Sequence, residues 1–213
     1  MKQLFEQTPK SFPENLPRFT FEGRIVLVLS PYETSRACRL LERQKIIGID
    51  TETRPKFTKG PMNKPALLQV ATHNICFLFR INKKPLHPSL IKVMADPDII
   101  KVGLSLKDDI AALNRINNFE PKGWIDLQDE VKRIGVKDQG LQRLFANLFH
   151  MRISKAKQRS NWEADVLTEA QQVYAATDAY ACLLLYEEIK KLQQTKDYEI
   201  IELPQEDNIK TKP

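Results

Sequence analysis

The order of apolar runs and helical segments along the chain constrains its fold more than any other feature of the sequence. Six short runs are rich in aliphatic and β-branched residues, which favour strands, and helical patterns lie between most of them. Only His73 and Asn74 separate the third run from the fourth, which predicts a hairpin. A hairpin within an alternating order of strands and helices predicts a mixed α/β sheet. The runs are residues 24–30, 45–52, 65–72, 75–81, 99–105 and 123–127.

The helical segments have recognisable start signals. Ser30 and Glu33 have the spacing of a capping box, and Pro31 stands at the first helical position, so we expect a helix from there to about residue 44. Further helices are expected near residues 89–95 and 106–116, and two or three more follow residue 127. The polar segment after Gln194 is expected to be loosely attached.

Length and composition limit the class of protein. A chain of 213 residues, 42% of them hydrophobic, can bury one sizeable core. Residues 1–19 contain acids and prolines where a signal peptide needs an unbroken apolar stretch, and no segment reaches the roughly 18 apolar residues of a membrane span. Cys38, Cys76 and Cys182 are widely spaced and odd in number, which favours reduced, buried thiols. We therefore expect a cytoplasmic protein without a membrane span.

Positive charge is concentrated in two parts of the chain, whose net charge is +6. The first part runs from Thr53 to Ala95 and contains no Asp or Glu. The second is a cluster of cations between His150 and Glu163. Such patches suit a polyanion such as nucleic acid, and a solvated basic face is the alternative. The cations are Arg54, Lys56, Lys59, Lys64, Arg80, Lys83, Lys84 and Lys92 in the first part, and Arg152, Lys155, Lys157 and Arg159 in the second.

Two acids end the strand candidate 45–52. Asp50 and Glu52 are two residues apart, so both side chains project from the same face of the strand, while Thr51 points the other way. They lie at the carboxyl end of the strand, where open α/β sheets usually bind their ligands. The alternative, that they begin an exposed loop, is disfavoured by the preceding apolar residues, which indicate a covered central strand.

Helical periodicity directs two further acids inward. In the segment 106–116, Asp109 falls on the apolar stripe, whereas Asp108 falls well outside it and suits the first turn of a helix capped by Ser105. In the segment 173–189, Asp178 lies within the apolar face, together with Tyr174 one turn earlier.

Four inward carboxylates would repel one another and would be desolvated together. Hard divalent cations resolve this conflict, because Mg²⁺ and Mn²⁺ prefer oxygen ligands, and a pair of ions can lie about 4 Å apart in such sites. A two-metal carboxylate site beside a basic surface suggests phosphodiester chemistry. The predicted ligands are Asp50, Glu52, Asp109 and Asp178.

Three segments resemble, in order, the exonuclease motifs of the DEDDy branch of the DnaQ-like 3′–5′ exonuclease superfamily: GIDTETRP, KVGLSLKDDIAAL and YAATDAYACLLLYEEI. The segment that ends in the third motif is similar to ribonuclease D and to the exonuclease domain of the Werner syndrome helicase. The sister branch has a histidine five residues before the last Asp, and none of the histidines stands there, so Tyr174 indicates the tyrosine branch. The resemblance covers about residues 22–192, with an extension at 1–21 and a polar tail at 193–213.

The resemblance implies an RNase H-like α/β fold, with a mixed five-stranded sheet that has one antiparallel strand and is flanked by helices. It also implies specific roles. Asp50 would bridge two Mg²⁺ or Mn²⁺ ions, Glu52 and Asp178 would complete the first site, and Asp109 would hold the second ion through water. Tyr174 would orient the water that attacks the terminal phosphodiester, and the product would be a nucleoside 5′-monophosphate. How Glu52 and Tyr174 divide the positioning of that water stays open.

The nucleic-acid contacts are less well defined by the sequence. Candidates are Arg54, Lys56, Leu68, Gln69, Lys155, Lys157 and Arg159, with a core position as the alternative for Leu68 and a solvated loop as the alternative for the last three. A catalytically inactive nucleic-acid-binding or scaffold module is the alternative to an exonuclease, but no acid of the set is missing. DNA or RNA as substrate, a single strand or a recessed end, the pathway and the oligomeric state all stay open.

Overall fold

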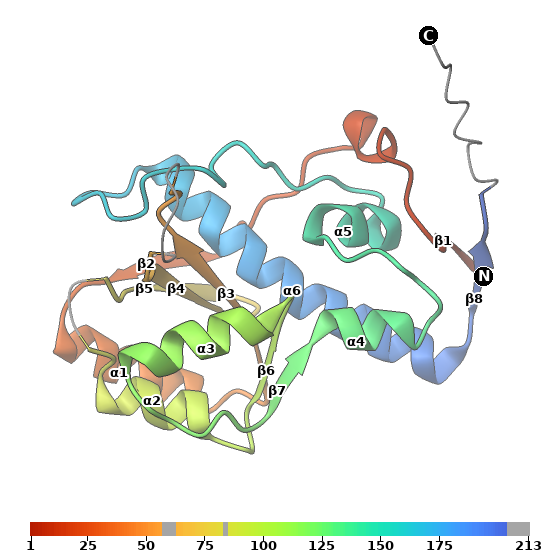
Figure 1. The fold of residues 1–213 in the computed structure, drawn as a ribbon. Helices are drawn as coiled ribbons and strands as arrows, with labels where there is room; N and C mark the ends of the chain where they lie inside the picture. The colour runs from red at the N-terminus through yellow and green to blue at the C-terminus, as the bar shows by residue number, and fades with distance from the viewer. Residues whose placement is uncertain (57–62, 83–84, 204–213) are drawn as a thin grey trace, which may run out of the picture.

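A computed structural model of the chain describes residues 1–56, 63–82 and 85–203 (Figure 1). The central sheet has the strand order β2-β5-β4-β3-β6-β7, and within the described chain β4 is its one antiparallel member. The strands of this sheet are β2 (Arg24–Val28), β3 (Ile46–Thr53), β4 (Pro65–Ala71), β5 (Ile75–Arg80), β6 (Ile100–Gly103) and β7 (Trp124–Asp126).

This sheet has six strands, one more than the five expected. The short strand β7 extends the sheet at one edge by pairing in parallel with β6, and its three residues lie opposite Lys101–Gly103. The predicted hairpin is confirmed, because β4 and β5 pair antiparallel next to the turn, with Ala71 opposite Cys76. The expected α/β class with one antiparallel strand is therefore correct.

Helices cover both faces of the sheet, as Figure 1 shows. Helices α1, α2 and α3 pack on one face, over Ile47 and Ile49 of β3, and α6 packs on the other face, toward which the acids of β3 point. Every residue of β4 is buried, because this central strand has helices on both sides. The helices are α1 (Pro31–Leu41), α2 (Pro88–Ala95), α3 (Leu106–Ile116), α4 (Leu127–Lys132), α5 (Leu141–Phe149), α6 (Glu169–Thr195) and the 3₁₀ turn η1 (Phe12–Asn15).

The helix starts follow the expected capping chemistry at two positions. The Ser30 hydroxyl accepts from the Glu33 amide, and the Glu33 carboxylate accepts from the Ser30 amide, so the predicted capping box is confirmed. Thr168 and Gln171 form a second capping box at the start of α6. Helix α1 ends at Leu41, somewhat earlier than expected.

The two ends of the described chain meet in a small parallel sheet of β1 (Lys2–Phe5) and β8 (Tyr198–Ile201). The side chain of Leu4 is fully buried, and the Asn147 amide group bonds both backbone polar groups of Phe5. The expectation of a loosely attached segment after Gln194 is wrong for the residues of β8, because pairing with β1 holds them. Residues 204–213 of the expected tail lie outside the described residues.

Two findings bear on the chemical environment of the chain. Cys38, Cys76 and Cys182 are free and buried, as predicted. Among the described residues, no helix combines the length and the apolar character needed to cross a membrane.

Candidate active site

Helix α6 passes unusually close to β3, and a glycine makes this approach possible. A Cβ atom built at Gly48 would lie 2.0 Å from the backbone carbonyl oxygen of Ala179, a separation that no real side chain tolerates. Any other residue at position 48 would therefore push α6 away from the sheet. Because Asp178 directly precedes Ala179, the close crossing sets its carboxylate beside the acids at the end of β3.

Three acids meet where α6 crosses β3. Asp50 and Glu52, from alternate positions of β3, lie beside Asp178, and one carboxylate oxygen of each falls within 4.8 Å of the others. Glu52 is 8% exposed and Asp178 is 4% exposed. Atom Oδ1 of Asp178 is buried and has no hydrogen-bond partner among the described residues. A compact set of carboxylates with an unsatisfied buried oxygen fits a hard divalent cation, which takes oxygen ligands.

The fourth acid, Asp109, comes from the first turn of α3 and contacts the face of β3 opposite to Asp50 and Glu52. It is half-buried and accepts a hydrogen bond from the Thr51 hydroxyl, whereas its neighbour Asp108 is exposed. The predicted inward direction of Asp109 is confirmed. Asp109 is not a member of the three-acid set of Asp50, Glu52 and Asp178, but its charge raises the pKa values of Asp50 and Glu52, so it lies near that set.

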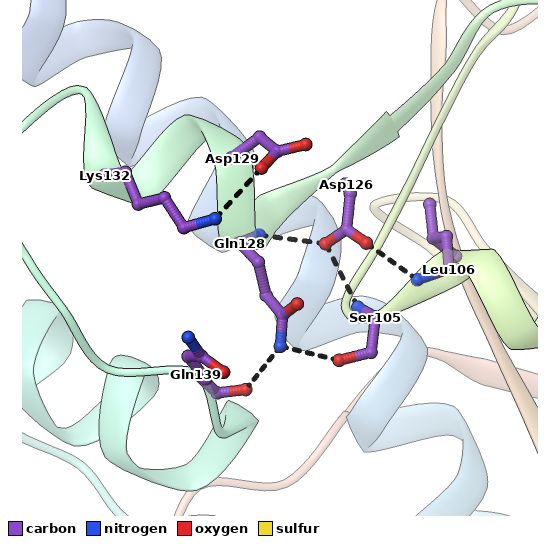
Figure 2. Close-up of polar contacts among 7 residues, drawn as sticks. All are labelled: Ser105, Leu106, Asp126, Gln128, Asp129, Lys132 and Gln139. Atoms are coloured by element: carbon purple, nitrogen blue, oxygen red, sulfur yellow. Dashed lines mark hydrogen bonds and ion pairs between the residues drawn. The ribbon is translucent and has the colours of Figure 1, made fainter.

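The cap of α3 differs from the expected one, as Figure 2 shows. Ser105 occupies the N-cap position with φ of 60°, and its hydroxyl accepts no bond from the helix. Instead, the Asp126 carboxylate accepts from the amides of Ser105 and Leu106 at 3.0 and 2.8 Å. The same carboxylate accepts from Gln128 at the start of α4, so one side chain caps two helices. Asp126 therefore fixes the turn from which Asp109 projects.

Burial and mutual repulsion raise the pKa values of the acids. Burial raises the pKa of Glu52 to about 10 and that of Asp178 to about 7, and the neighbouring carboxylates add to the shift at Glu52. Burial, followed by the charges of Asp178 and Asp109, also raises the pKa of Asp50 well above its ordinary value. The pKa of Asp109 rises to about 6 because of burial, and the Thr51 hydrogen bond opposes that rise. Protons and a divalent cation therefore compete for the same oxygens.

These shifts predict how stability depends on pH without metal. A carboxyl group whose pKa is higher in the folded protein binds protons that the unfolded chain has released, so rising pH weakens the folded state. Between pH 5 and pH 8 we expect the melting temperature to fall by roughly 5 to 10 °C. Calorimetry in EDTA measures this fall. Saturating Mn²⁺ should abolish it, and Glu52→Gln should reduce it, while Asp108→Asn, which removes only a smaller contribution to the raised pKa of Asp109, should change it little. A melting temperature that rises over this range would contradict the prediction.

Tyr174 lies one turn before Asp178 on α6, with its side chain turned inward, as predicted. It is buried, and its ring centre lies 6.0 Å from that of the fully buried Trp162. Burial raises the pKa of the Tyr174 hydroxyl, and the charges of Asp178 and Glu52 raise it further. In return, the hydroxyl favours the charged form of Asp178. Tyr174 is therefore a neutral hydrogen-bond donor held by packing beside the three acids.

The acids open into a surface cavity of about 300 Å³. The sequence predicted four of the residues that line the cavity, namely Asp50, Glu52, Tyr174 and Asp178. For Thr51 it predicted only that the side chain points away from Asp50 and Glu52. Cys182 could have been found, because it lies one helical turn after Asp178. The others come from segments that only the tertiary fold brings here. These are Leu104, Gly140, Leu141, Gln142 and Gln158.

The predicted basic contacts have different positions relative to this cavity. Lys157 and Arg159 are the sequence neighbours of Gln158, which lines the rim of the cavity, and Lys155 lies three residues before it. Arg54 follows the end of β3 and forms an ion pair with Glu163 at 3.2 Å, close to Lys56 in the chain. Other cations of the first basic part, Lys59, Lys83 and Lys84, lie outside the described residues.

Two predicted contacts on β4 are buried rather than exposed. Leu68 is fully buried and packs in the core under α1 and α2, on the face of the sheet away from Asp50. The core alternative is therefore the right one for Leu68. Gln69 pairs with Asp50 across the strands and shares its face, but it is also fully buried, and its side-chain amide has no described partner. Neither side chain offers surface to a nucleic acid in this arrangement.

Comparison with known proteins gives a consistent assignment. Residues 25–194 match the family described as 3'-5' exonuclease. The mouse protein "Bifunctional 3'-5' exonuclease/ATP-dependent helicase WRN" is 29% identical over 85% of this chain, which spans 14% of that protein. An Arabidopsis thaliana "3'-5' exonuclease" is 30% identical over 84% of the chain and 67% of its own length. The chain thus corresponds to a small part of the mouse relative and to about two thirds of the plant one.

A solved structure shares the fold of the chain. The crystal structure of the Aedes aegypti Nibbler EXO domain superposes with a TM-score of 0.76 at 23% identity. The match covers 85% of this chain and 95% of that one. This similarity supports the RNase H-like architecture that the family resemblance of the sequence implied.

Proposed function

The chain belongs to the 3′–5′ exonuclease family, and from this premise we propose that it is a two-metal-dependent exonuclease of the DEDDy type. It would remove nucleoside 5′-monophosphates one at a time from the 3′ end of DNA or RNA. The observation that carries the proposal is the convergence of Asp50, Glu52 and Asp178 at one open cavity. The proposed exonuclease domain comprises residues 22–192, between an N-terminal extension at 1–21 and a C-terminal tail at 193–213. The free, buried cysteines are consistent with a cytoplasmic location.

The acids divide into two positions for cations. Asp50, Glu52 and Asp178 would hold one Mg²⁺ or Mn²⁺ ion, and Asp50 and Asp109 would hold a second, with water between Asp109 and the ion. Two such cations would lower the pKa of the attacking water and stabilise the charge on the leaving 3′ oxygen. The Thr51 hydroxyl would orient Asp109, since it donates to that carboxylate from the opposite face of β3.

Tyr174 would position the attacking water by a hydrogen bond from its hydroxyl. Burial keeps this phenol protonated, and the ring of Trp162 limits its movement. Because the ring is already fixed before the substrate binds, little conformational entropy is lost when the water is aligned. Glu52, on the same face of the site, shares the positioning of that water in this proposal.

The test of the proposed function uses oligonucleotides labelled at the 3′ or the 5′ end, both DNA and RNA. In Mg²⁺ or Mn²⁺ we expect early loss of the 3′ label and a ladder of 5′-labelled products that shorten by single nucleotides. EDTA should stop the reaction, because four acids without cations cannot bind the phosphodiester. Undiminished cleavage in EDTA, or internal cuts as the first products, would contradict the proposal. Binding without cleavage in any metal would support an inactive module instead.

The basic segment at the rim of the cavity would bind the phosphates of the substrate strand. Replacing Lys155, Lys157 and Arg159 with alanine should weaken binding and reduce the slope of log affinity against log salt by about 2, because fewer counterions are released from a single strand. Turnover at saturating substrate should change little. Fluorescence anisotropy over a salt series measures the slope.

Three lysines elsewhere provide the control for that experiment. Lys122, Lys132 and Lys191 are exposed and already paired with Glu120, Asp129 and Glu188. Their replacement with alanine should leave the salt slope unchanged. If the rim variant also keeps the wild-type slope, its three cations are part of a solvated loop.

A further inference from the structure

A second charged surface lies far from the acidic cavity, along the free edge of the sheet. Strand β2 ends the strand order, so within residues 1–56, 63–82 and 85–203 no strand neighbours its outer side (Figure 1). Between β2 and α1 is a groove of about 380 Å³. The groove lies at the amino ends of β2 and β5. Strand β3 runs in the same direction as these two strands, and Asp50 and Glu52 lie near its carboxyl end, so the groove and the acids are at opposite ends of the sheet.

Four arginines line this groove with little to neutralise them. Arg36 and Arg39 lie on α1, Arg43 follows its C-terminal end, and Arg24 opens β2. All four side chains are exposed, and within the described residues none takes part in an ion pair. Glu33 is the acid that lines the groove, but its carboxylate is occupied by the capping box of α1. The groove is therefore a concentrated positive surface.

The floor of the groove is apolar. Val26, Ile75 and Phe77 form the floor. Leu40 on its wall is 43% exposed, and Tyr32, which lies outside the lining near the start of α1, is 69% exposed and has the Arg36 guanidinium over its ring. Exposed apolar side chains beside unpaired arginines are typical of a protein-binding surface, where anchors of this kind are enriched.

The edge of β2 has backbone groups free to pair with another strand. In the parallel pairing with β5, the Arg24 amide donates to Asn74, so alternate residues of β2 face β5 and the others face outward. The outward residues are Ile25 and Leu27, and no described group bonds their amides or carbonyls on that side. The next outward amide, that of Leu29, already donates to Glu33. Two residues of open edge thus remain beside the arginines.

We propose that this edge and groove bind an extended acidic segment of a partner protein as an added strand. Backbone bonds to Ile25 and Leu27 would hold the segment in the sheet. Side chains that alternate along an added strand would reach the two faces in turn. Acidic residues at every second position would face Arg36 and Arg39 of α1. Apolar residues between them would lie beside the side chains of Ile25 and Leu27, which pack toward the α6 face.

A protein segment fits these observations better than a nucleic acid does. A polynucleotide would use the arginines, but it has no peptide groups to satisfy the outward backbone of β2. It would also leave the exposed aliphatic side chain of Leu40 against a sugar-phosphate chain. The required partner is a stretch in which Asp or Glu alternates with an aliphatic residue.

The first experiment measures binding to the whole chain by fluorescence anisotropy. The probe is a short labelled peptide in which glutamate alternates with valine, and a peptide of the same composition in two blocks is its control. Arg39→Glu should weaken binding of the alternating peptide about tenfold, whereas Arg115→Glu, an exposed arginine on α3, should change it less than about twofold. Trimming of a 3′ end should be the same in both variants, so this test is independent of the proposed function.

The second experiment detects the added strand directly. Bound peptide should slow amide hydrogen exchange at Ile25 and Leu27, while Val26, whose amide faces β5, provides the internal control. Three results would overturn the proposal. These are no binding of the alternating peptide, equal binding of the block peptide, and binding without slower exchange at Ile25 and Leu27. Tighter Arg39-dependent binding of a single-stranded oligonucleotide than of the peptide would reassign the groove to nucleic acid.

Discussion

Asp109→Ala is expected to reduce turnover by about 10³-fold or more, whereas Asp108→Ala retains most of the activity. The two acids are adjacent in the sequence, but only Asp109 is turned inward, where it accepts from the Thr51 hydroxyl. Its negative charge raises the pKa values of Asp50 and Glu52, so it belongs to the same electrostatic site. Single-turnover cleavage of a 3′-labelled oligonucleotide in saturating Mn²⁺ measures both variants.

Asp108→Ala is the matched control for this experiment. It removes the same group from the neighbouring position of α3, so both variants lose an acid near the amino end of the helix. Melting at saturating Mn²⁺ checks that both variants are folded at the temperature of the assay. The reverse pattern of activities would mean that α3 presents the other acid to the site.

Removing the phenol of Tyr174 and removing the charge of Asp178 are expected to impair the enzyme in different ways. Tyr174→Phe keeps the ring packed beside Trp162, so metal binding should survive while the chemical step slows by about 10² to 10⁴. Asp178→Asn removes one charge from the buried set and should weaken metal affinity as well as rate. It should also raise the melting temperature in EDTA at alkaline pH, because it relieves repulsion with Asp50 and Glu52.

Three measurements separate these two variants. They are a Mn²⁺ titration, single-turnover cleavage at saturating Mn²⁺, and melting with and without metal. If Tyr174→Phe bound Mn²⁺ as poorly as Asp178→Asn, the tyrosine would act through the metal site itself. Wild-type cleavage by both variants would remove this part of α6 from the proposed mechanism.

The directions of the site residues could be predicted because local periodicity determines them. A period of two on β3 turns Asp50 and Glu52 to the same face and Thr51 to the other. The helical period separates Asp109 from Asp108, and it turns Tyr174 and Asp178 to the same side. Each of these directions depends only on neighbours within a few residues, which the sequence shows directly.

The remaining features could not be predicted because they depend on pairings between distant segments. The capping of α3 by Asp126 requires β7 to lie beside β6, so Ser105 looked like the better cap in the sequence alone. The burial of Leu68 and Gln69 requires helices on both faces of β4. The pairing of β1 with β8 joins the two ends of the described chain, and the polar residues around β8 gave little sign of it.

The close crossing of α6 over Gly48 also determines when the site comes into existence. More than half of the chain separates Asp50 from Asp178, so bringing the two acids together requires the closure of a long loop, which costs conformational entropy. A chain that has formed its sheet but has not yet docked α6 holds Asp50 and Glu52 without Asp178 or Tyr174. Such an intermediate lacks the third carboxylate and the phenol together. Under the proposed function, a chain whose helix α6 has not yet packed onto the sheet would therefore bind metal poorly and leave nucleic acid uncut.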